Sequence, residues 1–289
     1  MGMMGDLDQA VISNVVRIAL EEDIGEGDIT TLWTVPEKKR AVAKIISRDQ
    51  GVVAGLAVAS ETFRQVDPSL VFTCAASDGD EVVPDQIVVE LEGAARSMLT
   101  AERVALNFLQ RMSGIASLTQ KYVCECRGTE AKILDTRKTV PGLRELDKYA
   151  VALGGGGNHR MGLYDMVLLK ENHIEAADGI GPAIAAARSG MSRAGQRVQV
   201  EVEVESLAEL EDALAAGADW VMLDNMELEA MVRAVNRVNH NGDARPVIEA
   251  SGNVSLDNVG AIARTGVDVI SVGALTHSVP ALDLSMLIR

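Results

Sequence analysis

Six short apolar segments recur in the second half of the chain, and each is followed by a turn and a helical pattern. They occupy residues 131–138, 164–172, 198–205, 219–225, 246–253 and 268–274. Aliphatic and β-branched runs are typical of strands buried on both faces, as in a parallel sheet. The repeated strand and helix units predict right-handed crossovers, and therefore an α/β domain built on a parallel barrel or an open parallel sheet.

The helical patterns between these strands support the same interpretation. They cover residues 143–153, 180–193, 207–216, 227–238 and 256–265. Two of them begin with matching sequences, and Ser206 and Ser255 precede them where an N-cap oxygen would accept backbone N–H groups.

The first half has another pattern, with alternating strands punctuated by glycine, and it predicts a mainly antiparallel sheet. Helical patterns cover about 7–22, 56–66 and 97–126. We place a boundary near residue 112, between an N-terminal α/β sandwich domain (1–112) and an α/β-barrel domain (113–274). Periodicity alone does not assign the tail, 275–289.

Composition narrows the classes of partner. The net charge of −15 argues against nucleic acid and anionic membranes, but a basic cleft could still bind a small anion. The three cysteines, Cys74, Cys124 and Cys126, are odd in number and lack zinc-ribbon or thioredoxin spacing. We expect reduced thiols in a cytoplasmic protein without a signal peptide or membrane span, although the role of each cysteine stays open.

Polar residues and glycines gather where successive strands end. In an α/β barrel these carboxyl ends open on the face that carries the active site. Polar loops explain part of this pattern, but here the early strands end in basic residues and the later ones in acidic residues, serine or glycine. The residues are Arg137, Lys138, Lys170, Glu203, Asp224, Ser251, Gly252, Asn253 and Gly273. The separation predicts a substrate with two different ends.

The basic residues predict a cationic wall for an anion with more than one negative charge. They are Arg137, Lys138, His159, Arg160 and Lys170. Glu203 and Asp224 suit ribose hydroxyls, and the "SGN" and "VGA" turns offer backbone N–H groups to a phosphate.

Several of these features also have explanations that involve no function. The glycines at 154–157 are either a flexible linker or a loop of close approach, and we favour the second. Lys170 could be a surface lysine, and His173 suits a structural role. Glu201, Glu203 and Glu205 alternate with valines and share one face, so at least one of them is structural or exposed.

A helix in the first half carries Arg103, Asn107 and Arg111 on one face. This face is either solvated or presented to an active site, including that of a neighbouring subunit.

Long segments of the chain resemble the quinolinate phosphoribosyltransferase family. They include "ERVALNFLQRMSGIAS" and "DTRKTVPGLRELDKYAVALGGGGNHRMGLYDMVLLKENHI", with the shorter "EEDIGEGDITT", "VEVE", "VMLDN", "IEASGNV" and "ISVGALTHS". The resemblance implies an open-faced N-terminal sandwich, an incomplete barrel of about six strands, and a tail that rejoins the first domain. It also implies a homodimer with shared active sites, in which Arg103 reaches across, with further assembly left open.

The implied reaction joins quinolinate to phosphoribosyl pyrophosphate (PRPP), giving nicotinate mononucleotide, pyrophosphate and CO2 for de novo NAD synthesis. The implied enzyme is a pentosyltransferase. By this resemblance the quinolinate-binding residues are Thr136, Arg137, His159, Arg160 and Lys170, with Arg103 of the partner subunit. Those for PRPP are Arg48, Lys138, Glu203, Asp224, Ser251, Gly252, Asn253, Gly273 and His277. Lys138, Lys170, Glu203 and Asp224 would be catalytic, and Mg2+ would ride on the pyrophosphate with no direct protein ligand.

Three other functions remain open at the level of sequence. A homologue of the molybdenum-transport-associated type would use another acceptor. A Schiff-base lyase would use Lys170 as its nucleophile. A non-catalytic protein would bind an anion without turnover.

Overall fold

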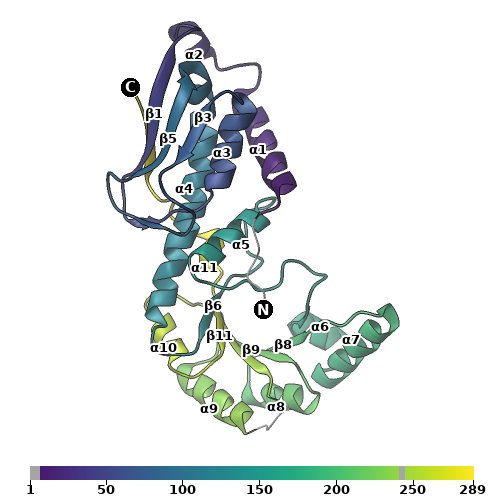
Figure 1. Cartoon of the computed structure of the whole chain (residues 1–289). Helices are drawn as coiled ribbons and strands as arrows, with labels where there is room; N and C mark the ends of the chain where they lie inside the picture. Colours follow the sequence, from purple (N-terminus) through teal and green to yellow (C-terminus); the bar gives the residue numbers. More distant parts are fainter. Residues whose placement is uncertain (1–6, 241–244) are drawn as a thin grey trace. The chain divides into compact units, whose positions relative to one another are not determined.

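The computed structural model describes residues 7–240 and 245–289, so the first six residues of the expected N-terminal domain lie outside the described residues. The chain divides into two compact units (Figure 1). Unit 1 comprises Met1–Gln120, Thr139–Gly155 and Leu275–Arg289, and unit 2 comprises Lys121–Lys138 and Gly156–Ala274. The division falls within the long helix α4 (Ala95–Glu125), which continues without a break through residue 112.

Unit 1 contains a four-stranded antiparallel sheet in the order β12-β1-β5-β3. The strands are β1 (Arg40–Ser47), β3 (Val71–Cys74), β5 (Ile87–Ala94) and β12 (Leu284–Ile288), and β2 (Gly51–Val52) and β4 (Glu81–Val82) form a separate pair. The sheet packs through a core that includes Ile45, Leu91, Phe63 and Met98, with α3 (Leu56–Val66) and α4 supplying the helical side chains. One face is thereby covered by helices, as the open-faced sandwich requires.

The tail of the chain completes this sheet. β12 pairs antiparallel with β1, and Met286 lies opposite Ile45. Leu284 and Met286 of this strand are buried in the same core, because every second residue points to the helical face, and Leu282 just before the strand joins them.

Unit 2 contains a six-stranded parallel sheet in the order β6-β11-β10-β9-β8-β7. Its strands are β6 (Lys132–Leu134), β7 (Val167–Leu169), β8 (Val200–Val204), β9 (Trp220–Asp224), β10 (Val247–Ser251) and β11 (Val269–Ser271). Each lies within one of the apolar segments that predicted it. The predicted fold class is therefore confirmed, with a parallel sheet in one unit and an antiparallel sheet in the other.

The helices between the strands largely follow the sequence pattern. In unit 2 they are α6 (Glu171–Ala176), α7 (Ile180–Ala194), α8 (Leu207–Ala215), α9 (Leu228–Asn239) and α10 (Val259–Ala263). Figure 1 shows α8, α9 and α10 along the outer side of the parallel sheet. The remaining helices are α1 (Gln9–Ile24), α2 (Ile29–Thr34), α5 (Arg144–Leu153) and α11 (Ala274–His277).

The two predicted N-caps have different outcomes. The Ser206 hydroxyl accepts the Glu209 N–H at the start of α8, as expected. The prediction for Ser255 is wrong, because its own N–H donates to the Asn258 side chain and α10 begins only at Val259. The helix α6 was not predicted. It begins directly after Lys170, where Nδ1 of His173 accepts the Lys170 N–H, so His173 has a structural role.

Among the described residues, no helix is both long enough and apolar enough to cross a membrane.

Candidate active site

A cavity of about 590 Å³ opens at the carboxyl ends of the parallel strands in unit 2. Every strand of the sheet contributes to it, through its last residues or the loop that follows. The lining residues are Thr136, Arg137, Lys138, His159, Arg160, Leu168, Lys170, Glu203, Met222, Asp224, Asn225, Glu249, Ser251, Gly252, Asn253 and Ser271. This is the edge of a parallel sheet at which α/β proteins bind their ligands.

A second, larger cavity of about 780 Å³ lies elsewhere in unit 2. It is lined by Val198 and Gln199, which precede β8, and by Asp219, which precedes β9. These are amino ends of strands, where conserved architecture usually serves stability and not catalysis. The smaller cavity is therefore the better candidate for the active site.

The smaller cavity brings together eleven of the residues that the sequence singled out. They are Thr136, Arg137, Lys138, His159, Arg160, Lys170, Glu203, Asp224, Ser251, Gly252 and Asn253. Among the described residues, Gly273 follows β11 without lining the cavity.

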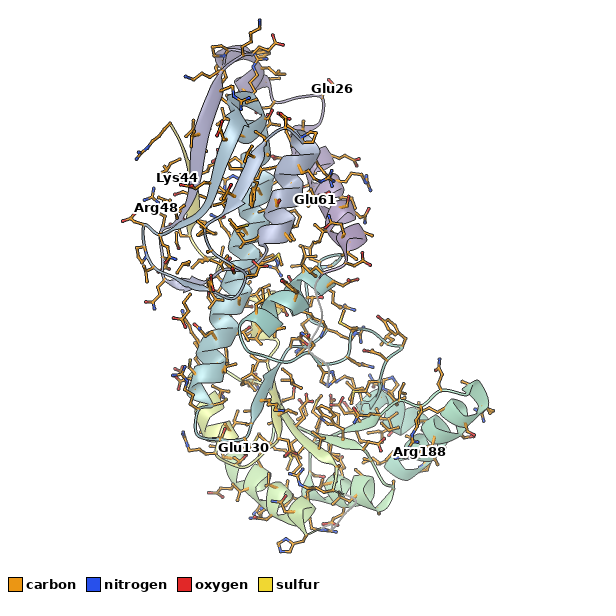
Figure 2. The ribbon with its side chains drawn as sticks, viewed as in Figure 1. Glu26, Lys44, Arg48, Glu61, Glu130 and Arg188 are labelled. Atoms are coloured by element: carbon orange, nitrogen blue, oxygen red, sulfur yellow. The ribbon has the colours of Figure 1, made fainter. Side chains whose placement is uncertain are left out.

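The other three expected residues, Arg48, Arg103 and His277, belong to unit 1. Arg48 follows β1 (Figure 2) and pairs with Asp85 at 3.2 Å, and its Nε donates to the Ser285 hydroxyl. Nδ1 of His277 lies 2.6 Å from the Ser278 hydroxyl. Arg103 is exposed on α4.

The residues on the helix face that carries Arg103 differ in their surroundings. Asn107 is also exposed, whereas Arg111 is half-buried. Its guanidinium makes two hydrogen bonds to the buried Asp147 carboxylate, at 3.0 and 2.7 Å, and a third to the Thr276 carbonyl. Arg111 therefore stabilises unit 1.

The glycine loop holds part of the cation wall in place. A Cβ on Gly154 would lie 2.3 Å from the Ala116 carbonyl oxygen, so this position requires glycine and the linker interpretation is wrong. Gly157 extends the sheet edge, because its N–H donates to the Ile133 carbonyl and its own carbonyl accepts the Asp135 N–H. Buried Asp135 then accepts the His159 N–H at 2.9 Å, which fixes the main chain beside the cavity.

The charges in the cavity are arranged differently from the two separate walls that the sequence predicted. Lys170 forms an ion pair with Glu203, so one basic and one acidic group are in contact. Arg137 and Arg160 lie close enough to repel each other, and burial together with this repulsion lowers the pKa of Arg160. Two crowded guanidinium groups favour the entry of an anion between them.

A tight turn follows β9 and β10. Gly252 has a φ of 91°, and a Cβ there would lie 2.2 Å from Oδ1 of Asn225. The Asn225 N–H donates to the Ser251 carbonyl, and its Nδ2 donates to Asp224 at 2.8 Å. Asn253 in turn donates to Oδ1 of Asn225 at 2.9 Å. Asn225 thus links Asp224 to the glycine turn, a role that its position directly after a strand did not reveal.

Sequence reasoning also missed Glu249 and left Glu201 without a role. Both side chains are buried, and both contact His159. Two of the three glutamates belong to β8, where Glu201 is buried and Glu203 lies at the cavity, whereas Glu205 follows the strand and is exposed.

Comparisons with known proteins identify the family. The description "Quinolinate phosphoribosyl transferase, C-terminal domain" matches residues 115–287, and the corresponding N-terminal domain matches residues 28–113. The chain is 43% identical to quinolinate phosphoribosyltransferase [decarboxylating] 1b of Nicotiana tabacum, over 95% of this chain and 81% of that protein. It is 42% identical to the probable nicotinate-nucleotide pyrophosphorylase [carboxylating] of Bacillus subtilis, over 92% of this chain and 89% of that protein.

Solved structures agree with the sequence matches. The nicotinate-nucleotide pyrophosphorylase of Francisella tularensis superposes with a TM-score of 0.94 at 42% identity, covering 100% of both chains. The enzyme of the same name from Ehrlichia chaffeensis gives a TM-score of 0.91 at 36% identity, covering 99% of this chain and 100% of that one. The chain belongs to the quinolinate phosphoribosyltransferase family.

Proposed function

We propose that this chain is a decarboxylating quinolinate phosphoribosyltransferase of de novo NAD biosynthesis. It transfers the phosphoribosyl group of PRPP to the ring nitrogen of quinolinate and releases nicotinate mononucleotide, pyrophosphate and CO2. The observation that carries the proposal is one cavity that combines crowded guanidinium groups, the carboxylates of Glu203 and Asp224, and a glycine turn. A dianionic acceptor and a phosphorylated sugar need these three features side by side.

Quinolinate is held by the cationic part of the cavity. Arg137 and Arg160 bind its carboxylates through paired N–H groups, and binding relieves the repulsion between the two guanidinium groups. Lys170 and His159 add further positive charge, and Thr136 lines the same wall. Since Lys170 already contacts Glu203, the incoming carboxylate competes with Glu203 for the ammonium group.

PRPP is held by the acidic part and the turn. Glu203 and Asp224 accept hydrogen bonds from the ribose hydroxyls and stabilise the positive charge that develops at the anomeric carbon. The turn at Ser251, Gly252 and Asn253 binds the 5′-phosphate through backbone N–H groups. Lys138, exposed at the rim, meets the pyrophosphate.

Mg2+ enters with PRPP. Phosphate oxygens and water would supply its ligands with no direct protein ligand, which suits a rim where Lys138 and Asn253 are exposed to solvent. When bound, the ion would offset part of the negative charge of the pyrophosphate.

The bond changes need no covalent enzyme intermediate. The bond between the anomeric carbon and the pyrophosphate oxygen breaks, and the pyridine nitrogen forms the new bond to that carbon. The resulting pyridinium ring accepts the electron pair released when the 2-carboxylate leaves as CO2, and the ring carbon then takes a proton from water. Orienting the two substrates can contribute roughly 7–11 kcal/mol to lowering the barrier.

The proposed reaction is tested with purified protein, PRPP and Mg2+, using quinolinate and nicotinate as parallel acceptors. We expect nicotinate mononucleotide and CO2 to form with quinolinate as the acceptor, and no nicotinate mononucleotide to form with nicotinate. The reason is that nicotinate lacks the second carboxylate, which supplies half of the charge that the cation wall binds. Folded protein that yields no product from either acceptor would contradict the proposal and favour a homologue with another acceptor.

We also propose that the active enzyme is a homodimer in which Arg103 of the partner subunit completes each quinolinate site. Arg103 is exposed on α4, as a residue that acts in another subunit must be. Arg103→Ala and Arg137→Ala should each be inactive as pure proteins. Co-expression of the two should restore about a quarter of wild-type activity, because half of randomly mixed dimers hold one intact site. Mixed dimers that form without recovering activity would contradict shared sites.

Gly252→Ala should raise the KM for PRPP at least about 10-fold, because a left-handed residue with a side chain is strained by roughly 1–2 kcal/mol and its Cβ would collide with Asn225. The matched control is Gly181→Ala in α7, where a Cβ meets nothing within 4 Å. Initial-rate measurements at saturating quinolinate check both variants. An unchanged KM for PRPP in Gly252→Ala would remove this turn from the phosphate site.

We propose a cytoplasmic location. A reducing compartment suits the three free thiols, Cys74, Cys124 and Cys126.

A further inference from the structure

His159 lies between two buried carboxylates that the proposed reaction does not use. Its Nε2 is 3.0 Å from Oε2 of Glu201 and 3.3 Å from Oε2 of Glu249. The side chains of both glutamates are 0% exposed and that of His159 is 7% exposed, and His159 and Glu249 both border the cavity. One ring nitrogen thus faces the interior, while the same side chain forms part of the substrate wall.

The register of the parallel sheet creates this cluster. Glu201 on β8 lies opposite Trp220 on β9, and Glu249 on β10 lies opposite Met222. The two glutamates therefore approach the same point from either side of β9. From β9 itself Trp220 presents an uncharged ring, edge-on to His159 with the centroids 5.8 Å apart. Asp135 after β6 holds the main chain of His159.

A proton on the His159 ring offsets part of the negative charge of this cluster, and the guanidinium of Arg160 also interacts with Glu201. Oε1 of Glu201 and Oε1 of Glu249 are buried with no hydrogen-bond partner in the described part of the chain. Two such carboxylates are costly to bury unless a cation compensates them, and the imidazolium is the cation in contact with both.

The pKa shifts of His159 and Glu201 agree with this geometry. Burial by itself would lower the pKa of His159, but the contacts and negative charge of Glu201 and Glu249 outweigh it and raise the pKa to about 10. Burial, and then the charge of Glu249, raise the pKa of Glu201 above its ordinary value. At neutral pH the ring therefore keeps both of its protons.

We propose that Glu201 and Glu249 are positioning residues that hold His159 as an imidazolium, and so make it a permanent cation in the quinolinate wall. This inference rests on the proposed function for the identity of the anion. It assigns the two glutamates a part in substrate binding without contact to substrate. A histidine without these neighbours would lose its charge near pH 6.5, within the working range of most enzymes.

The same three side chains could in principle hold a metal ion, since their ligand atoms lie within 4.8 Å of one another. A metal would require the neutral imidazole, because the ligating nitrogen must give up its proton. The two states are therefore exclusive and can be distinguished.

The protonation state is measured directly by nitrogen-15 NMR of the histidine rings. The chain has four histidines, so His159→Gln identifies the resonances of His159. We expect both ring nitrogens of His159 to remain protonated up to pH 9 in the wild-type protein. In Glu201→Gln/Glu249→Gln, whose side chains keep their shape but lose their charge, the ring should become neutral at or below about pH 6.5. A neutral wild-type ring at pH 7.5, or a stoichiometric bound metal, would overturn the inference.

Kinetics test the consequence for quinolinate. In the double variant, kcat/KM for quinolinate should fall roughly 10- to 100-fold as the pH rises from 5.5 to 8.5, because hydrogen bonds to a charged group are lost. The wild type should lack this decline, and the KM for PRPP should change little in both. Glu249→Gln alone should show an intermediate effect. Glu205→Gln is the matched control, since this glutamate directly follows the same strand but is exposed.

A similar decline with pH in Glu205→Gln, or an equal rise in both KM values in the double variant, would overturn the positioning role. The NMR experiment contains no substrate. An absence of turnover would therefore count against the proposed function, whereas a neutral His159 would count against this inference alone.

Discussion

Arg137→Ala should lower kcat/KM for quinolinate by roughly 100- to 1,000-fold while leaving the fold intact. The side chain lies at the cavity beside Arg160, where its fork of N–H groups can bind a carboxylate at two points. Truncating one partner of such a charged pair typically costs 2–5 kcal/mol, roughly the range of the expected loss. Arg137→Lys should recover only part of the activity, since it keeps the charge but not the fork.

Steady-state assays with each substrate varied separately check this result, and circular dichroism checks the fold. Arg193→Ala is the matched control, because Arg193 is exposed near the end of α7 and does not line the cavity. Near-wild-type kcat/KM in Arg137→Ala would remove Arg137 from the active site.

Arg111→Met should lower the free energy of unfolding by about 3–5 kcal/mol, since removing one partner of a buried ion pair leaves the other charge uncompensated. Asp147 is fully buried, and Arg111 supplies two of its hydrogen bonds. Arg17→Met on α1 is the control. Its ion pair with Glu21 is exposed and should contribute about 0.5 kcal/mol or less.

Urea unfolding followed by circular dichroism gives both free energies. Removing the charge of the partner as well, in Arg111→Met/Asp147→Asn, should recover much of the stability. An Arg111→Met protein as stable as Arg17→Met would show that water, and not the arginine, compensates Asp147.

The local hydrophobic pattern of the sequence was sufficient to predict the strands of the parallel sheet. Strands such as Trp220–Asp224 and Val269–Ser271 are mainly apolar because both faces are covered, and that burial appears as a continuous run in the sequence. The short helices at Ile29–Thr34 and Glu171–Ala176 were not predicted, because one or two turns of helix leave no periodic pattern.

By itself the sequence determined which strands form and which residues follow their carboxyl ends, because parallel strands deliver these ends to one edge wherever each strand lies in the sheet. Arg137, Lys170, Glu203 and Asp224 could therefore be assigned to one cavity. Only the tertiary structure decided which of these groups touch. Lys170 meets Glu203 because β7 and β8 are neighbours, and Glu201 and Glu249 meet at His159 because β8 and β10 flank β9. Strand order and register depend on packing between segments that are distant in the sequence, so the local hydrophobic pattern does not determine them.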